Sequence, residues 1–138
     1  MHLPARLRSQ PGALRDLVAL ILELTAHPSP ETDADQEARV ESNPAWGFPA
    51  AWVDAAEAAI FLCRADAPTV ALLQFRIEML LNDPHPGVRF VVAEHLTALW
   101  ETNRELMWRL ARKVAELEVN RGVLRFFVNS SIVSPDVV

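Results

Sequence analysis

Apolar residues recur at steps of three and four along most of the chain, which is the spacing of one face of an α-helix. The first such stretch begins at Pro11, a residue well suited to a first helical turn. It stops at His27 and Pro28, because proline cannot continue a helix. We therefore expect a helix over "PGALRDLVALILEL", residues 11–24, with an apolar face made of Leu14, Leu17, Val18, Ile21 and Leu22.

The same pattern resumes at Pro49 and predicts five further helices, over residues 49–64, 68–81, 87–101, 103–117 and 121–133. Short links join them, and such links make consecutive helices antiparallel neighbours. Several of these helices carry apolar residues on two faces, so they must be covered on both sides. No tight turn lies between alternating strand patterns. We expect an all-α fold, an α-α superhelix of stacked antiparallel helical hairpins within a single domain spanning residues 1–138.

The segment at about 27–48 differs from the rest because it is rich in acidic residues and proline. Thr32 could cap a short helix over residues 33–41, since acidic side chains favour a first helical turn. The remainder of the segment is expected to be irregular surface chain.

Between two predicted helices lies the proline-rich stretch "NDPHPG", residues 82–87. Its prolines end the preceding helix, and Asn82 or Asp83 can bond local backbone groups at a turn. Gly87 allows a tight entry into the next helix. His85 is expected to be a solvated loop residue. The stretch is therefore interpreted as a structural corner between helices.

This corner and the helix after it resemble a HEAT repeat, with matches at Asp83, Pro84, Val88, Arg89, Ala93 and Leu96. The resemblance implies that Asp83 and Arg89 pair across the corner or between layers, in a structural role. It also implies a HEAT/ARM-like α-solenoid. The stretch from "NPAWGFPAAW" to "NRGVL" further resembles helical-repeat segments of large bacterial multidomain proteins, including NACHT-type signalling ATPases.

Composition narrows the classes of function. The chain has 138 residues, 51% of them hydrophobic and 22% charged, with a formal net charge of -5. A nucleic-acid partner is disfavoured because such binding usually needs a basic face. One cysteine, Cys63, cannot form an internal disulfide, and no apolar run is long enough to span a membrane. We expect a cytoplasmic protein.

No pattern of catalytic, metal-binding or cofactor-binding residues emerges. The four histidines lack ligand spacing, and Cys63 lies on an Ala-rich helix, as a small core residue does. His95 is expected to be a partly buried histidine beside an apolar face. We expect a protein that is not an enzyme and needs no metal or cofactor.

Two clusters are candidates for a protein interface. The aromatic cluster Trp46, Phe48 and Trp52 could form binding hot spots or could close the end of the helical stack. The basic cluster Arg109, Arg112 and Lys113 could bind a partner or be an ordinary solvated helix face. The apolar C-terminal end also favours self-association or covering by a neighbour.

The leading hypothesis is a non-catalytic helical-repeat module that mediates protein–protein interaction or assembly. One alternative is a nucleic-acid-binding HEAT-like protein, including the DNA glycosylases of that architecture. The other is a plain helical-bundle oligomer.

Overall fold

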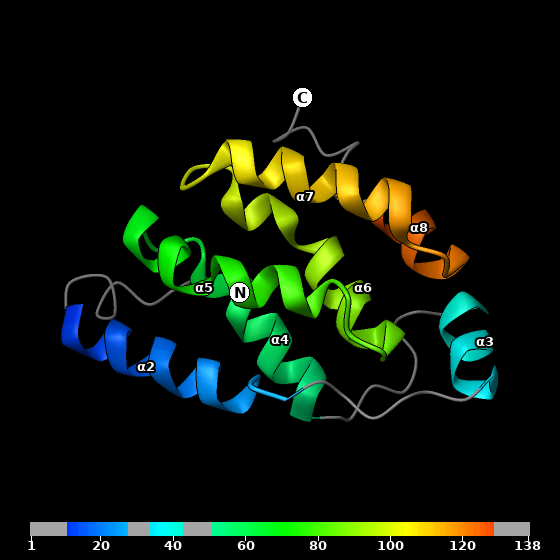
Figure 1. Cartoon of the computed structure of the whole chain (residues 1–138), viewed down its shortest axis with the longest axis horizontal. Coiled ribbons are helices and arrows are strands. Elements are labelled where there is room, and N and C mark those ends of the chain that lie inside the picture. The colour runs from blue at the N-terminus through cyan, green and yellow to red at the C-terminus, as the bar shows by residue number, and fades with distance from the viewer. Residues whose placement is uncertain (1–10, 28–33, 43–50, 129–138) are drawn as a thin grey trace.

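The computed structural model describes residues 11–27, 34–42 and 51–128, which are all-helical and contain no strand. This confirms the all-α expectation for that part of the chain. None of its helices has both the length and the apolar character needed to cross a bilayer. The elements shown in Figure 1 are α2 (Pro11–Leu24), α3 (Ala34–Ser42), α4 (Ala51–Leu62), α5 (Ala67–Leu80), α6 (Pro86–Glu94), the 3₁₀ turn η1 (Leu96–Leu99), α7 (Arg104–Leu117) and α8 (Arg121–Phe127).

Short polar side chains start three of these helices. Asp66, Asn103 and Asn120 stand immediately before α5, α7 and α8. Each side-chain oxygen accepts a backbone N–H from the first turn of its helix, at 2.8, 3.0 and 3.0 Å respectively. These caps satisfy N–H groups that have no partner within the helix. Each of these helices can therefore begin directly after a short link.

Helices α2 and α5 lie side by side and run in the same direction (Figure 1). Near their starts, Leu14 and Pro68 line one small hollow. Near the end of α2, the Arg76 guanidinium of α5 donates to the Leu22 carbonyl at 2.7 Å and to the Thr25 hydroxyl at 3.0 Å. The two helices are therefore parallel neighbours that contact each other through their side chains.

Helix α7 continues this row beyond α5. Gln74 of α5 lies by the start of α7 at Asn103, and Asn82, just past the end of α5, lies by Leu117 at the end of α7. Between these points the Glu78 carboxylate accepts a hydrogen bond from Arg109 at 2.9 Å. Helices α2, α5 and α7 thus form one parallel row.

The second row consists of α4, α6 and α8, in which α4 packs against α6 and α6 packs against α8. Helix α6 is covered on nearly every side, as its two apolar rows predict. Its buried residues are Pro86, Gly87, Val88, Phe90, Val91, Val92 and Ala93. The core therefore lies around α6, between its neighbours in this row and the adjoining helices.

One predicted helix is wrong in its extent. Residues 87–101 were expected to form a single helix, but α6 ends at Glu94 and the backbone leaves the helical region at His95. The chain then forms the 3₁₀ turn η1, whose Leu96 and Leu99 are fully buried. An apolar repeat at i and i+3 suits either helix type, so periodicity could not distinguish them. The His95 ring lies 4.6 Å from the Phe61 ring of α4.

The acidic segment contains the predicted short helix, now seen as α3 at Ala34–Ser42. It packs against α8 and α6, although it is far from both in the sequence (Figure 1). Thr32, the expected cap, lies outside the described residues, as do residues 28–33 and 43–48 of the same segment.

Candidate functional site

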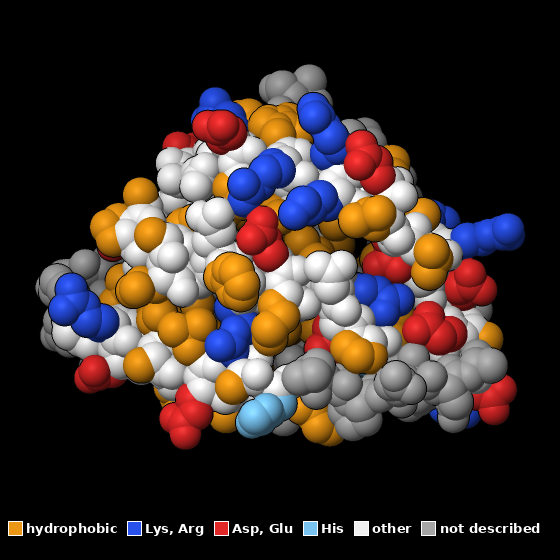
Figure 2. Space-filling view, in the orientation of Figure 1, with side chains coloured by type: hydrophobic (Ala, Val, Ile, Leu, Met, Phe, Trp, Pro, Cys, Tyr) orange, Lys and Arg blue, Asp and Glu red, His pale blue; other side chains and the backbone are white. Residues whose placement is uncertain are grey.

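The parallel row presents exposed large hydrophobic side chains from each of its three helices. Phe75 of α5 is the most exposed of them, at 80%. Figure 2 views this side of the molecule and shows hydrophobic side chains gathered over α2 and α5. These side chains are Leu20, Leu24, Leu72, Phe75, Trp108 and Leu117. Trp108 and Leu117 are nine positions apart, two and a half turns, so they lie on opposite sides of α7. Leu72 and Phe75 lie three positions apart on one side of α5, and we call this pair the apolar face. Single exposed hydrophobic residues are ordinary, but neighbouring large ones, of which Phe75 is 80% exposed, form a candidate interaction surface.

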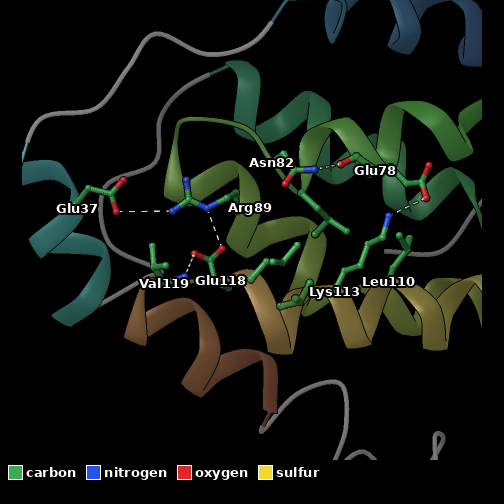
Figure 3. Close-up of a pocket in the computed structure, with 11 residues that line it drawn as sticks. Glu37, Glu78, Asn82, Arg89, Leu110, Lys113, Glu118 and Val119 are labelled. Atoms are coloured by element: carbon green, nitrogen blue, oxygen red, sulfur yellow. Dashed lines mark hydrogen bonds and ion pairs between the residues drawn. The ribbon is translucent and has the colours of Figure 1, made fainter.

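A groove of about 360 Å³ lies between α5 and α7 at the edge of this face (Figure 3). Its floor is apolar, since Leu110 and Val114 line it. Leu110 is fully buried and Val114 is nearly so. Charged side chains from five segments surround that floor: α3, α5, α6, α7 and the link before α8. The full lining of this α5–α7 groove is Glu37, Glu78, Leu81, Asn82, Arg89, Leu110, Lys113, Val114, Leu117, Glu118 and Val119.

At one side of the groove, two cations share one carboxylate. The Glu78 Oε1 atom accepts from Arg109 at 2.9 Å and lies 3.8 Å from the Lys113 ammonium. Both cationic side chains are about half exposed. Pairs of this kind contribute little stability, so this arrangement leaves a net positive charge at the rim without fixing the fold.

At the other end of the groove, Arg89 of α6 connects the corner to two other segments (Figure 3). Its guanidinium donates to the backbone carbonyls of Asp83 and Pro84, at 2.8 and 3.1 Å. It also donates to Glu118 at 2.9 Å and lies 3.7 Å from Glu37. The planar fork of an arginine suits several acceptors at once.

Glu118 and Asn120 complete this arrangement. The Glu118 side chain is only 6% exposed, and its second oxygen accepts the backbone N–H groups of Val119 and Asn120 at 3.0 and 3.1 Å. The Asn120 amide donates to the carbonyl and the carboxylate of Glu37, at 3.2 and 3.1 Å. We call Glu37, Arg89, Glu118 and Asn120 the corner cluster. It joins α3, the α5–α6 corner and the link before α8.

The corner itself differs in detail from the expectation drawn from HEAT repeats. The Asp83 carboxylate is buried and accepts the backbone N–H of His85 at 2.9 Å. The contact seen between Arg89 and Asp83 runs to the backbone carbonyl of Asp83. Pro84 and Val88 flank this turn, and Val88 is buried. Asn82 donates to the Glu78 carbonyl at 3.1 Å, so both polar turn residues bond locally as expected.

His85 is not a solvated loop residue, which corrects the expectation. It is half-buried, and its Nδ1 atom accepts the Gly87 backbone N–H at 2.9 Å, so the imidazole caps α6. Burial lowers the pKa of His85, and the Arg89 charge lowers it further, whereas Asp83 and Glu37 act to raise it. The cap needs a neutral ring, because a protonated Nδ1 has no lone pair to accept with.

This cap predicts a pH-dependent stability. A lowered folded-state pKa means that the stabilisation is present above the unfolded value of about 6.5 and is lost as the pH falls through the folded value. We expect His85→Ala to lower the free energy of unfolding by about 1 kcal/mol at pH 8, and by less at pH 5. Urea unfolding of both proteins at several pH values measures this. An equal loss at both pH values would refute the cap.

The structure describes one residue of the predicted aromatic cluster and all three residues of the predicted basic cluster. Trp52 lies on α4 and is 43% exposed, whereas Trp46 and Phe48 lie outside the described residues. Arg109 and Lys113 border the α5–α7 groove through Glu78. Arg112 is exposed on the same helix but is absent from the groove lining.

Cys63 is a buried structural residue. Burial raises the pKa of its thiol to about 12, and the Sγ atom donates to the Ala59 carbonyl at 3.6 Å. A protonated thiol of this kind is a poor nucleophile and a poor metal ligand. Within residues 11–27, 34–42 and 51–128, no three His, Cys, Asp or Glu side chains are grouped closely enough to hold a metal ion.

Sequence reasoning missed Glu37, Glu118 and Asn120. Asn120 could have been recognised, because asparagine just before an apolar helix is a frequent cap. The two glutamates carried no local signal, since Glu118 meets Arg89 across 29 positions and Glu37 meets Asn120 across 83.

Comparisons with known proteins leave the site to be interpreted from its own geometry. No family model, no curated protein and no solved structure matches the chain.

Proposed function

We propose that the chain is a non-catalytic helical-repeat module that binds another protein through the apolar face. The observation that carries this proposal is the exposure of two neighbouring large hydrophobic side chains on α5, Leu72 at 53% and Phe75 at 80%. When a partner covers such a surface, apolar area is removed from water, which lowers the free energy of association.

The two helical rows support a repeat organisation. Helices α4 and α5 pack as one antiparallel hairpin. Helix α7 follows α6 through η1, packs on η1, and ends beside the start of α6 at the Arg89–Glu118 pair. Stacked hairpins of this kind produce parallel rows such as α2–α5–α7 and α4–α6–α8. We interpret the chain as a short HEAT-like α-solenoid in which the α2–α5–α7 row forms the binding side.

The chemistry of the groove favours binding over catalysis. Glu118 and Glu37 accept hydrogen bonds from Arg89 and Asn120, so their oxygens serve the fold. Cys63 is buried and protonated at neutral pH. The formal net charge of -5 also weighs against a nucleic-acid backbone as the occupant. A single buried thiol suits a reducing compartment, so we place the protein in the cytoplasm.

Substitution on the apolar face provides the test. We expect Phe75→Ser to reduce recovery of the partner by about tenfold or more in affinity capture from cells that contain the protein, because hot-spot losses commonly exceed 1.4 kcal/mol. Val128→Ser is the matched control, since Val128 is 43% exposed but lies at the end of α8. The proposal fails if both variants recover the same proteins as the parent.

Light scattering separates this proposal from the oligomer alternative. A parent protein that has twice the monomer mass, and that becomes monomeric on Phe75→Ser, would identify a second copy as the ligand of the apolar face. A monomeric parent leaves a different protein as the partner.

A further inference from the structure

We infer that the α5–α7 groove binds an amphipathic helix of a partner protein. Beside its apolar anchors, that helix carries a carboxylate side chain, which faces Lys113. This inference rests on the proposed function and names the kind of partner. Three features of the groove carry it: the length of its apolar floor, the chemistry of its walls and the charge at its rim.

The apolar floor has the length of a two-turn helical contact. Leu110, Val114 and Leu117 lie at positions i, i+4 and i+7 of α7, a span of about 10 Å along the helix axis. Leu110 and Val114 form the base, and Leu117 is 65% exposed at the lip. Partner helices that dock in grooves insert side chains at i, i+3 or i+4, and i+7, which span the same length.

The walls exclude recognition through a main-chain ladder. Both walls are α-helices, and the backbone groups of a helix interior bond within that helix. An extended peptide in the groove would therefore leave its own N–H and C=O groups without backbone partners from these walls. A helical ligand satisfies its backbone internally and needs only side-chain contacts, so the groove favours a helix over a strand.

The charge at the rim selects an acidic side chain. Glu78 offers one carboxylate oxygen to both Arg109 and Lys113, and the longer distance, 3.8 Å, is the one to Lys113. A partner carboxylate beside Lys113 would balance the second cation. At the opposite end, the Glu118 oxygens already accept hydrogen bonds from Arg89 and two backbone N–H groups. Charge selection is therefore expected at the Lys113 end alone.

Designed peptides test this inference directly. Three 16-residue peptides of high helix propensity would carry leucine at i, i+4 and i+7, flanked by glutamate in the first and by lysine in the second. The third would have the glutamate composition in scrambled order. We expect the glutamate peptide to bind at least about tenfold more tightly than the lysine peptide, and the scrambled peptide not to bind. Amide shifts in the NMR spectrum should map to α7 and the end of α5.

A charge-reversal pair supplies the matched control. Lys113→Glu should invert the preference, so that the lysine peptide binds more tightly. Arg112→Glu makes the same change in charge on the preceding residue, which is exposed and absent from the groove lining. This variant should keep the original order of affinities. The preference should also shrink as salt rises, because the rim charges are exposed.

Three results would overturn the inference: no peptide binds, the lysine peptide binds as tightly as the glutamate peptide, or Lys113→Glu and Arg112→Glu act alike. In each case the proposed function stands separately, provided that Phe75→Ser still loses the cellular partner. If Phe75→Ser keeps that partner, then the proposed function fails first.

Discussion

Replacing Arg89 with alanine is expected to lower the free energy of unfolding by about 3 kcal/mol. The substitution removes the donor for two corner carbonyls and leaves the Glu118 carboxylate, which is 6% exposed, without its guanidinium partner. A buried charge that has lost its partner costs more than the intact pair contributes. Urea or guanidinium unfolding, monitored by circular dichroism, measures the loss.

Two further variants test the cause of that loss. Arg112→Ala removes an exposed arginine and should change the free energy of unfolding by no more than about 0.5 kcal/mol. Adding Glu118→Gln to Arg89→Ala should restore part of the stability, because it neutralises the stranded carboxylate. An Arg89→Ala protein that unfolds like its parent would show that the corner cluster does not hold the layers together.

Replacing Phe127 with alanine is expected to lower the free energy of unfolding by about 4 kcal/mol. Phe127 is the last residue of α8 and is fully buried. Helix α8 has only seven residues, too few for a stable isolated helix, so its packing against α6 must hold it in place. Removing the ring leaves a cavity within the α4–α6–α8 row.

The next residue offers a close control for this cavity. Val128 is 43% exposed, and Val128→Ala should cost less than about 0.5 kcal/mol. Calorimetric melts of both variants measure the difference. Equal melting temperatures would mean that α8 adds nothing to the core, and that the second row ends at α6.

The helices could be predicted because their determinants are local. Pro11 begins α2 as expected, and the apolar rows of α5 and α7 follow the 3.6-residue period. The polar turn at Asn82 and Asp83 also follows from the chemistry of short side chains. Periodicity predicted which segments are helical and where the links between them lie, because it reports which side of each helix must be buried.

The groove and the corner cluster could not be predicted, since both depend on residues distant in sequence. Nothing near Arg89 indicates that Glu118 will meet it, because that contact depends on how α7 lies against α5. The role of His85 was missed for a related reason. Its ring could point to water or back to the Gly87 N–H, and the local sequence does not distinguish these rotamers.

Arg76 and Arg89 have a shared consequence for recognition. Each guanidinium reaches an acceptor at the C-terminal end of a helix of the parallel row: Arg76 reaches the Leu22 carbonyl of α2, and Arg89 reaches the Glu118 carboxylate just past α7. These ends carry the negative pole of the helix macrodipole, where a cation is favoured. A slip of one helical turn, about 5.4 Å, would separate each arginine from its acceptors. The axial register of the row is therefore fixed before any ligand arrives, and a partner meets a preorganised surface that needs little ordering on association.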